Sequence, residues 1–522
     1  MNPIEYLVTS EEMQRYDSNT ISNFKVPGIV LMEQAALSCF QEIKNIHTTC
    51  KNVLVLAGKG NNGGDAMALA RLLFQNQYSV TVCILNNSDD ITSGLSESAR
   101  IQYDILTSMK LPIVTKLPDD SYDIIIDGIF GVGLSRDIVG NTADVIHQVN
   151  QYSAYKISLD MPSGVDATTG KIFNVAFKAD MTLTFAFLKR GLFLLPGARY
   201  AGKVVKCSIG ITEDSFFDQP PVMISLTGSI HDYLPKRDPF GHKGTFGKVL
   251  LIAGSRDIGG AAILSGMACL KSGCGMLRIL THTNQKSDIL TSIPEAMIDE
   301  YRCLEEALLQ LEKGMAWADV IAIGPGIGTD SVAENILMTV IKESMKPLVV
   351  DADAINLLSN IQLYSILKEL QNNESNKRSL ILTPHPLELA RICHCDMGKV
   401  MENGIQLAVD LAKDLNAVVI KKDANTIITD GDRFALNRNG NSGMATAGSG
   451  DVLCGITAGL LAQHLSVFEA AVISVYLHAL SGDYAAQVGN EYSLIASDII
   501  NSISKVLIKK ENTLRRKYEK TL

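Results

Sequence analysis

Short runs of consecutive apolar residues, each followed by a turn, recur along most of the chain. In the first half they occupy 53–57, 80–85, 123–127, 156–160 and 181–186. A second series occupies 248–253, 276–280, 319–323, 347–351, 379–383 and 417–421. Helix-like stretches such as 65–76 and 97–109 lie between them. Continuous apolar strands that alternate with helices predict an α/β fold whose parallel sheets are covered on both faces.

One segment interrupts this alternation. Residues 213–240 contain Pro220, Pro221, Pro235 and Pro239, several charges and no long periodic run, so we expect a domain boundary there. A chain of 522 residues is also too long for one ordinary domain. We therefore expect one domain over 1–215 and a second over 224–510, each a three-layer αβα sandwich.

Charge and hydropathy exclude two classes of partner. The net charge is −9 with no basic block, whereas nucleic-acid binding needs clustered Lys and Arg. The C-terminal cluster alternates with Glu, and we interpret it as a solvated helix end. It comprises Lys509, Lys510, Arg515, Arg516 and Lys517. No run of 18 or more apolar residues occurs, so we expect no membrane span.

Ten cysteines are scattered along the chain and none forms a CxxC pair, which is typical of reduced thiols in a cytoplasm. Cys393 and Cys395 flank His394, but no second Cys/His pair stands at zinc-site spacing. The N-terminus carries Glu5 and Glu11 where a signal peptide has basic residues and an apolar run. We expect a cytoplasmic protein that forms a homo-oligomer.

A glycine-rich loop follows the first predicted strand and opens a helix. It reads Gly58-Lys59-Gly60-Asn61-Asn62-Gly63-Gly64-Asp65. Glycines there let backbone amides approach a phosphate, and the helix N-terminus favours negative charge. The loop is neither a GxGxxG nor a Walker A sequence. A plain strand-to-helix turn is the alternative, but the Asn-Asn-Gly-Gly-Asp string favours ligand binding.

Two further strands end in an aspartate. The loops after them read Asp127-Gly128-Ile129-Phe130-Gly131-Val132-Gly133-Leu134 and Asp160-Met161-Pro162-Ser163-Gly164-Val165-Asp166. One such aspartate is often only a helix cap or turn former. Two of them, with an Asn-Asn loop at the same sheet edge, indicate one shared site. Asn62, Asp127 and Ser163 supply hard oxygen donors that can hold a cation there.

These residues resemble the NAD(P)H-hydrate epimerase family across essentially all of 1–212. The resemblance includes the run from Pro27-Gly28 to Met32-Glu33-Gln34-Ala35-Ala36 and the run from Lys189-Arg190-Gly191-Leu192 to Pro196-Gly197-Ala198. It implies interconversion of the R and S epimers at the hydrated carbon of the nicotinamide ring in NADH hydrate and NADPH hydrate. One position departs from the family, because Ala66 stands where a Gly is common.

The same resemblance implies roles for individual residues. It places K⁺ between Asn62, Asp127 and Ser163, and it makes Asp160 a substrate contact and the candidate for proton transfer. The implied substrate contacts are Asn61, Asn62, Gly63, Gly64, Asp65, Gly131, Val132, Gly133, Leu134, Ser135, Arg136, Asp137 and Asp160.

The longest motif lies in the second half. It reads Asn441-Ser442-Gly443-Met444-Ala445-Thr446-Ala447-Gly448-Ser449-Gly450-Asp451-Val452-Leu453. A Gly-Ser-Gly-Asp turn that opens an apolar helix places backbone amides around developing negative charge. Its aspartate, Asp451, stands where it can take a proton from a hydroxyl. An ordinary glycine-rich helix start is the alternative.

This motif resembles the anion hole and catalytic Asp of the ribokinase-like superfamily, and its surroundings resemble NAD(P)H-hydrate dehydratase. Further matches follow in the family's order between 240 and 500. They are His242-Lys243-Gly244, Gly254-Ser255, Gly259-Gly260-Ala261-Ala262, the run from Leu270 to Gly275, Gly324-Pro325-Gly326-Ile327-Gly328, Asp351-Ala352-Asp353-Ala354 and Thr383-Pro384-His385-Pro386-Leu387-Glu388. The resemblance implies a Rossmann-like first domain and a ribokinase-like second domain.

By position, the implied dehydratase substrate contacts are Ala261, Gly326, His385 and Asp451. The implied nucleotide contacts are Lys422, Asp423, Ala424, Asn425, Thr426 and Gly450. Asp423 stands where the family often has Gly or Ser. A core histidine is the alternative for His385, although its place between two prolines at a strand end favours the site.

The implied mechanism resembles that of a kinase. Asp451 deprotonates the ring hydroxyl, a nucleotide phosphoryl group moves onto it, and phosphate is then eliminated. The amides of 448–451, with Mg²⁺, stabilise the moving group. ADP is the expected co-substrate, giving AMP and phosphate, and ATP is the alternative. Two other hypotheses stay open: a ribokinase-superfamily vitamin or sugar kinase with an accessory domain, and a non-catalytic dinucleotide-binding scaffold.

Overall fold

The computed structural model describes residues 4–46, 51–86 and 90–508. The chain divides into two compact units: Glu5–Ile224 forms one, and Ser225–Leu522 together with Ile4 forms the other. The predicted helix end with Lys509, Lys510, Arg515, Arg516 and Lys517 lies outside the described residues. Among the described helices, none is both long enough and apolar enough to cross a membrane.

The N-terminal unit is built on a parallel sheet of order β4-β3-β2-β5-β6-β7-β9. Its strands are β2 (Asn52–Ala57), β3 (Ser79–Ile84), β4 (Ile113–Val114), β5 (Ile124–Gly128), β6 (Tyr155–Leu159), β7 (Met181–Phe185) and β9 (Lys203–Cys207). Outside that seven-stranded sheet, β1 (Ile4–Val8) pairs in parallel with β8 (Leu188–Lys189). All five strands expected in this half are present.

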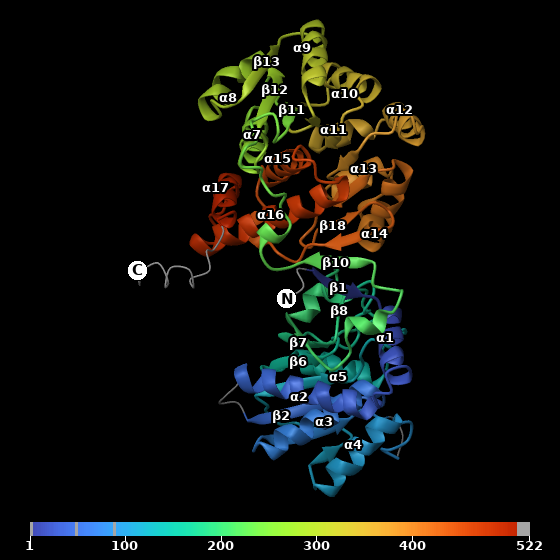
Figure 1. The fold of residues 1–522 in the computed structure, drawn as a ribbon. Helices are drawn as coiled ribbons and strands as arrows, with labels where there is room; N and C mark the ends of the chain where they lie inside the picture. The colour runs from blue at the N-terminus through green and yellow to red at the C-terminus, as the bar shows by residue number, and fades with distance from the viewer. Residues whose placement is uncertain (1–3, 47–50, 87–89, 509–522) are drawn as a thin grey trace. The chain divides into compact units, whose positions relative to one another are not determined.

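Helices cover both faces of that sheet (Figure 1). Val53 and Val55 pack with residues of α2 (Gly28–Ile46), α3 (Asn61–Gln75) and α4 (Glu97–Ser108). Leu54 and Leu56 point the other way and pack with α5 (Asn141–Asn150). This alternation follows from the two-residue period of a strand. The capping box of Thr9 and Glu12 starts α1 (Ser10–Ser22), and α6 (Ala198–Ala201) is a single turn.

The helix that the sequence places at 65–76 starts four residues earlier, at Asn61. The first turn was not predicted from the sequence because it contains Gly63 and Gly64, and glycine is a poor helix former. A Cβ on Gly63 would lie 1.9 Å from the Gly58 carbonyl oxygen, and one on Gly64 would lie 2.4 Å from Cε of Met32. The glycines therefore let the first turn of α3 pack closely against its neighbours.

The C-terminal unit contains the strand order β13-β12-β11-β14-β15-β16-β17-β18-β19. Pairing is parallel up to β17 and antiparallel from β17 to β19. The strands are β11 (Lys248–Ile252), β12 (Met276–His282), β13 (Met297–Tyr301), β14 (Val320–Ile323), β15 (Leu348–Val350), β16 (Leu380–Leu382), β17 (Val418–Lys421), β18 (Ile427–Thr429) and β19 (Phe434–Leu436). A short strand, β10 (Met223–Leu226), spans the boundary between the units.

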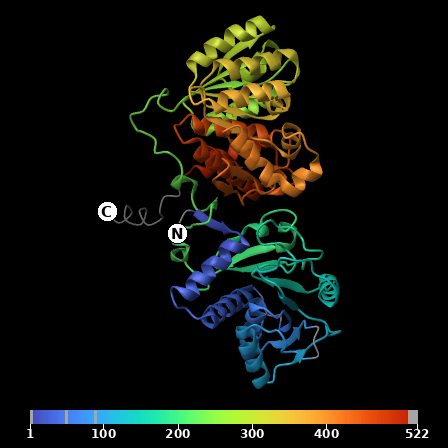
Figure 2. The ribbon, with the colours of Figure 1, turned by 90° about the vertical axis from the view of Figure 1, so that its right-hand side faces the viewer.

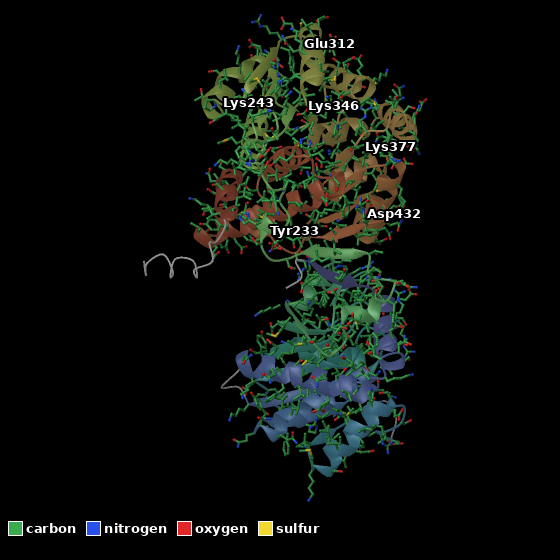
Figure 3. The ribbon with its side chains drawn as sticks, viewed as in Figure 1. Tyr233, Lys243, Glu312, Lys346, Lys377 and Asp432 are labelled. Carbon is green, nitrogen blue, oxygen red and sulfur yellow. The ribbon has the colours of Figure 1, made fainter. Side chains whose placement is uncertain are left out.

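Helices again lie on either side of the strands (Figure 2). One face packs against α9 (Leu304–Trp317), α10 (Ser331–Glu343), α11 (Ala352–Leu358), α12 (Ile361–Asn372), α13 (Pro386–Ile392) and α14 (Met397–Asp414). Four other helices pack against one another: α7 (Gly260–Lys271), α15 (Ser449–Leu461), α16 (Val467–Val488) and α17 (Ala496–Val506). The short helix α8 (Lys286–Ser292) follows β12 along the chain. Exposed charges such as Glu312, Lys377 and Asp432 lie on the outer surface (Figure 3). The predicted α/β fold is confirmed.

Two candidate active sites

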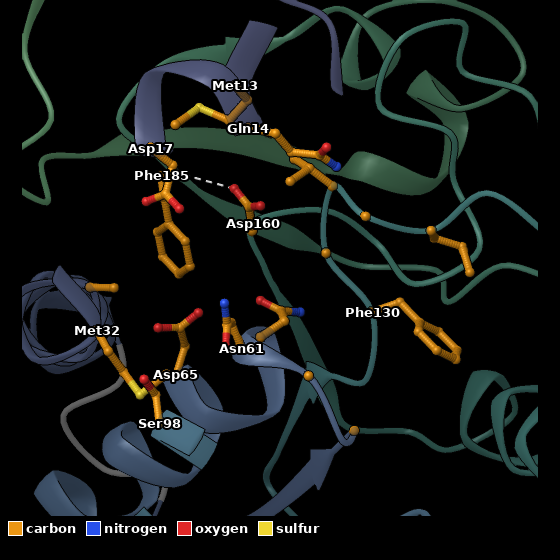
Figure 4. A pocket seen from close by; sticks show the side chains of 18 of the residues that line it. Met13, Gln14, Asp17, Met32, Asn61, Asp65, Ser98, Phe130, Asp160 and Phe185 are labelled. Carbon is orange, nitrogen blue, oxygen red and sulfur yellow. Dashed lines mark hydrogen bonds between the residues drawn. The ribbon is translucent and has the colours of Figure 1, made fainter. Parts of the chain in front are cut away.

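A cavity of about 820 Å³ lies in the N-terminal unit (Figure 4). It is lined from α1, α2 and α3 and from the loops that follow β2, β5 and β6. The predicted residues that line it are Asn61, Asn62, Asp65, Gly131, Val132, Gly133, Leu134, Ser135, Arg136 and Asp160. Gly63 and Gly64 lie buried beneath the lining, and Asp137 is not part of it.

Asp160 is held in an unusual backbone conformation at the end of β6. Its φ of 65° lies in the left-handed region, which a non-glycine residue adopts at a cost and most often near functional sites. Lys189, fully buried, donates to Oδ1 of Asp160 at 2.5 Å, and the Phe185 amide donates to the same oxygen at 3.2 Å. The other oxygen, Oδ2, lies 3.3 Å from where a Cβ on Gly131 would stand. Asp160 therefore has one oxygen fixed and one directed toward the Gly131 loop.

Two more carboxylates face the same cavity. Asp65 on α3 and Asp17 on α1 point into the space that Asp160 borders (Figure 4). Burial raises the pKa of Asp65 well above its usual value, and the charges of Asp160 and Asp17 raise it further. Burial, and then Asp160, also raises the pKa of Asp17. The cavity thus combines three acids with one buried ammonium group, that of Lys189.

Asp127 and Ser163 lie behind the lining and are fully buried. Asp127 accepts hydrogen bonds from the Ser163 hydroxyl at 2.6 Å, the Ser163 amide at 2.8 Å and the Ser158 hydroxyl at 3.0 Å. Burial raises the pKa of Asp127 to about 6, although these hydrogen bonds oppose the rise. The two predicted cation ligands are thus in direct contact.

Asn62, the third predicted cation ligand, lies against the same strand end. A Cβ on Gly128 would stand 3.0 Å from the Asn62 carbonyl oxygen. The buried Oδ1 of Asn62 accepts no hydrogen bond from the described residues, an arrangement that costs free energy unless a ligand compensates. Amide, hydroxyl and carboxylate oxygens suit a hard cation, so these residues fit such a group.

The second site surrounds the start of α15 in the C-terminal unit. Gly448 precedes the helix with φ of 85°, and a Cβ there would lie 2.4 Å from Leu264. Burial raises the pKa of Asp451 to about 7, with a further rise from Asp351 and an opposing effect from Lys422. An aspartate with such a pKa can accept a proton near neutral pH. A Cβ on Gly450 would stand 3.4 Å from Nζ of Lys422, so the predicted nucleotide residues Lys422 and Gly450 are neighbours.

Lys422 sits between two buried carboxylates. Its Nζ lies 2.9 Å from Oδ1 of Asp351 and 3.7 Å from Oε2 of Glu388. Burial alone would lower the pKa of Lys422, but the two carboxylates outweigh burial and raise it. Burial raises the pKa of Glu388 to about 7, with Lys422 opposing. The hydroxyl of Thr383 also donates to Asp351, at 2.5 Å.

His385 caps helix α13. Its Nδ1 accepts from the amides of Leu387 at 3.1 Å and Glu388 at 3.3 Å, while its own amide donates to Glu388 at 2.8 Å. Burial, followed by the charge of Lys422, lowers the pKa of His385, which favours the neutral ring that such capping requires. His385 therefore has a structural task beside the Lys422 cluster.

The remaining predicted residues lie at the start of α7, in the loop after β14 and in the turn after β17. A Cβ on Gly326 would stand 3.1 Å from Cβ of Ala261, and the Gly328 amide donates to Asp353 at 2.9 Å. Residues 422–426 form the turn between β17 and β18, where the Thr426 hydroxyl donates to the Asp423 carbonyl at 3.1 Å. The Asp423 carboxylate pairs with Lys421 at 2.8 Å. Within the described ranges, no group of three or more His, Cys, Asp and Glu side chains is arranged to hold a metal, the Cys393–Cys395 segment included.

Four charged residues of these sites were not predicted as site residues. Lys189, Asp351 and Glu388 stand inside the motifs quoted above, but only the folded distances reveal their pairing. Asp17 belongs to no motif and carries no signal of its own in the sequence.

Two different protein families match the N-terminal and the C-terminal parts of the chain. A family described as YjeF-related protein N-terminus matches 28–191, and one described as NAD(P)H-hydrate dehydratase matches 249–505. The bifunctional NAD(P)H-hydrate repair enzyme of Moorella thermoacetica is 34% identical over 526 residues, which is 96% of each chain. This chain belongs to the bifunctional NAD(P)H-hydrate repair enzymes. The Escherichia coli repair enzyme is 29% identical over 480 residues, 91% of this chain and 89% of its own.

Two solved structures resemble the C-terminal half of this repair enzyme. An ADP/ATP-dependent NAD(P)H-hydrate dehydratase from Bacillus subtilis is 28% identical, with a TM-score of 0.46 over 53% of this chain and 95% of its own. A ribokinase-like superfamily protein from Enterococcus faecalis is 31% identical, with a TM-score of 0.46 over 53% and 93%. The predicted family, the bifunctional enzyme class and the repair of NAD(P)H hydrates are confirmed.

Proposed function

We propose that the N-terminal unit interconverts the R and S hydrates of NADH and NADPH, and that the C-terminal unit dehydrates the S epimer with ADP, giving AMP and phosphate. The proposal rests mainly on the groups that surround Asp451. This acid has a pKa of about 7 and stands at the start of α15, next to the Gly448–Gly450 turn and near Lys422. A proton acceptor, a set of free amides and a cation are what phosphoryl transfer to a hydroxyl requires.

In the epimerase site, the free amides at the start of α3 and the Gly131 loop would hold the dinucleotide, because a helix N-terminus favours its phosphates. We assign the contacts to 61–65, to 131–137 and to Asp160. Asp160 would exchange protons with the substrate through its free oxygen. K⁺ would bind Asn62, Asp127 and Ser163, where it would satisfy the unpartnered Asn62 oxygen and fix the loops that carry the lining.

In the dehydratase site, Asp451 would take the proton of the ring hydroxyl while that oxygen attacks the terminal phosphorus of the nucleotide. Lys422 and the amides of 448–451 would stabilise the charge on the moving phosphoryl group. Departure of phosphate with the C–O electron pair, and loss of a proton from the adjacent ring carbon, would restore the dihydronicotinamide. Mg²⁺ would be bound mainly through the nucleotide phosphates, with one or two carboxylates such as Asp351 and Glu388.

The remaining contacts follow from the loops around this site. Ala261, Gly326 and His385 would touch the hydrate, and 422–426 with Gly450 would line the adenine nucleotide. ATP can replace ADP in the same geometry. Free thiols at the nine described cysteines favour a reducing compartment, so we propose the cytoplasm. Assembly into a homo-oligomer stays a prediction.

The division of labour is tested with the fragment 224–522 and the full chain. We expect the fragment to dehydrate only the S epimer and the full chain to consume both. Consumption of the R epimer by the fragment would contradict the assignment. Phosphorylation of pyridoxal or hydroxymethylpyrimidine, with no dehydration of either hydrate, would instead identify a vitamin kinase.

A further inference from the structure

The epimerase cavity holds three carboxylates and one buried ammonium group. Asp17, Asp65 and Asp160 converge from α1, α3 and the end of β6 (Figure 4). Lys189 is fully buried and forms its ion pair with Asp160, at 2.5 Å. Asp17 and Asp65 have neither an ion pair nor a hydrogen bond from side chains within the described ranges. Three carboxylates beside one buried cation favour the retention of a proton within the cluster.

Asp65 is the acid of this cluster whose pKa is raised furthest above its usual value. The charged groups that act on it are Asp160, Asp17 and Lys189, and burial is the largest cause of its raised pKa. From α2 it faces Cys39, whose thiol stays neutral because burial and the neighbouring Cys207 raise its pKa well above the usual value.

The rim of the cavity carries two further cations, Lys59 and Arg136, and from α4 it receives the uncharged Ser98. Neither cation forms an ion pair with Asp65. Asp65 therefore lies in the cavity without a neutralising partner among the described residues, and Asp160 directs its Oδ2 into the same cavity.

We propose that Asp65 is the second proton-transfer residue of the epimerase, alternating with Asp160 as acid and base at the hydrated carbon. The inference rests on the epimerase activity proposed above and deepens it. Such a pair meets the need of an inversion, which requires one group to release a proton and another to accept one.

One direction of the reaction begins with protonation of the substrate's hydroxyl group. Asp65 donates its proton to the hydroxyl oxygen, the C–O bond breaks, and water leaves with the bonding pair. The lone pair of the adjacent ring nitrogen forms a C=N bond, which leaves a cationic ring. A solvent water then adds to the opposite face, its lone pair forming the new C–O bond, and its proton passes to Asp160. The reverse direction uses Asp160 as the acid and Asp65 as the base.

The test uses the full chain with purified R hydrate, and chromatography separates the R and S products in the absence of ADP. We compare Asp65→Asn, Asp17→Asn and the control Glu11→Gln, which changes an exposed acid on the same helix as Asp17. Asp65→Asn should slow epimerisation on the order of 10²–10⁴-fold while the hydrate still binds. Glu11→Gln should leave the rate unchanged.

Asp17→Asn should change the pH dependence of the epimerisation rate. Removal of a negative neighbour lowers the pKa of Asp65, so the loss of rate on the alkaline side should begin at lower pH than in the wild type. A purely structural role of Asp17 would lower the rate without moving the profile. In water labelled with ¹⁸O, each inverted molecule should carry the label, because the original hydroxyl departs.

Three results would overturn the inference: Asp65→Asn epimerising within tenfold of the wild type, an unmoved pH profile in Asp17→Asn, or inversion without ¹⁸O uptake. If Asp65→Asn does not fold by circular dichroism, the pH profile of Asp17→Asn decides. A wild-type chain that does not epimerise would instead refute the proposed function itself.

Discussion

Replacement of Asp451 by Asn should abolish dehydration and stabilise the C-terminal unit at the same time. Asn keeps the shape and hydrogen-bonding capacity of the side chain but cannot accept the hydroxyl proton. Loss of a general base costs on the order of 10²–10⁴ in rate. Epimerisation should continue, because Asp160 and the other residues of that site belong to the N-terminal unit.

The stability effect follows from the raised pKa of Asp451. A rise from 3.8 to about 7 corresponds to about 4 kcal/mol at roughly 1.4 kcal/mol per pKa unit. Solvent screening at this partly buried side chain reduces the value, and we expect about 2–4 kcal/mol. The folded pKa lies above the unfolded one, so the wild type loses stability as the pH rises from about 4 to 7. Asp451→Asn should therefore be more stable than the wild type at pH 8 and equal to it near pH 3.5.

Two measurements check this prediction. NADH formation from S hydrate and ADP reports dehydration, and thermal unfolding at both pH values reports stability. The control is Asp432→Asn, because the Asp432 side chain is 88% exposed and its replacement should change neither quantity. In the wild type, dehydration should increase as the pH rises through about 7, where Asp451 ionises. Dehydration by Asp451→Asn at nearly the wild-type rate would refute the reasoning and make His385 the next candidate base.

Three further predictions concern other residues of the two sites. Asp127→Ala should lower epimerisation and leave dehydration of the S epimer intact, whereas equal loss of both in a folded protein would show that the cation site is wrongly assigned. Lys422→Met leaves Asp351 and Glu388 without their cation, so urea unfolding should show a loss of about 3–5 kcal/mol. Because Lys422 lowers the pKa of Glu388, its removal raises that pKa above about 7, and the loss should shrink as the pH falls through that higher pKa and Glu388 takes up a proton. Unchanged stability would contradict the pairing. Gly448 has a φ of 85°, in the left-handed region, and a Cβ there would point toward Leu264. Gly448→Ala should therefore lower the free energy of unfolding by at least about 1–2 kcal/mol and slow dehydration. Unchanged stability and an unchanged dehydration rate would show that the turn is not strained.

The sequence predicted the central strands well and the edge strands poorly. Every expected strand coincides with an observed one, because central parallel strands are buried on both faces and are therefore continuously apolar. The missed strands β9 and β13 lie at sheet edges, where sequences such as Lys203–Cys207 and Met297–Tyr301 mix charged and apolar residues. The hairpin of β18 and β19 was also missed.

The motifs predicted which loops form the two sites, but the charge balance within each site depends on contacts between distant segments. Asp17 reaches the cavity only because α1 packs beside it, and no local pattern marks this residue. Lys189 and Asp160 are 29 positions apart, and Lys422 and Asp351 are 71 apart. Pairing at such separations is set by the topology of the sheet. The pKa values of Asp65, Glu388 and Asp451 follow from that burial and pairing, which the sequence alone does not contain.

The central claim is that one chain repairs both epimers. The most direct measurement incubates the purified chain with an equal mixture of R and S NADH hydrate, ADP, Mg²⁺ and K⁺, and follows NADH absorbance to completion. A rate faster than spontaneous epimerisation and conversion of the whole mixture are the predicted results, and omission of ADP should prevent any NADH formation. A plateau at half conversion, or no NADH from either epimer, would contradict the account.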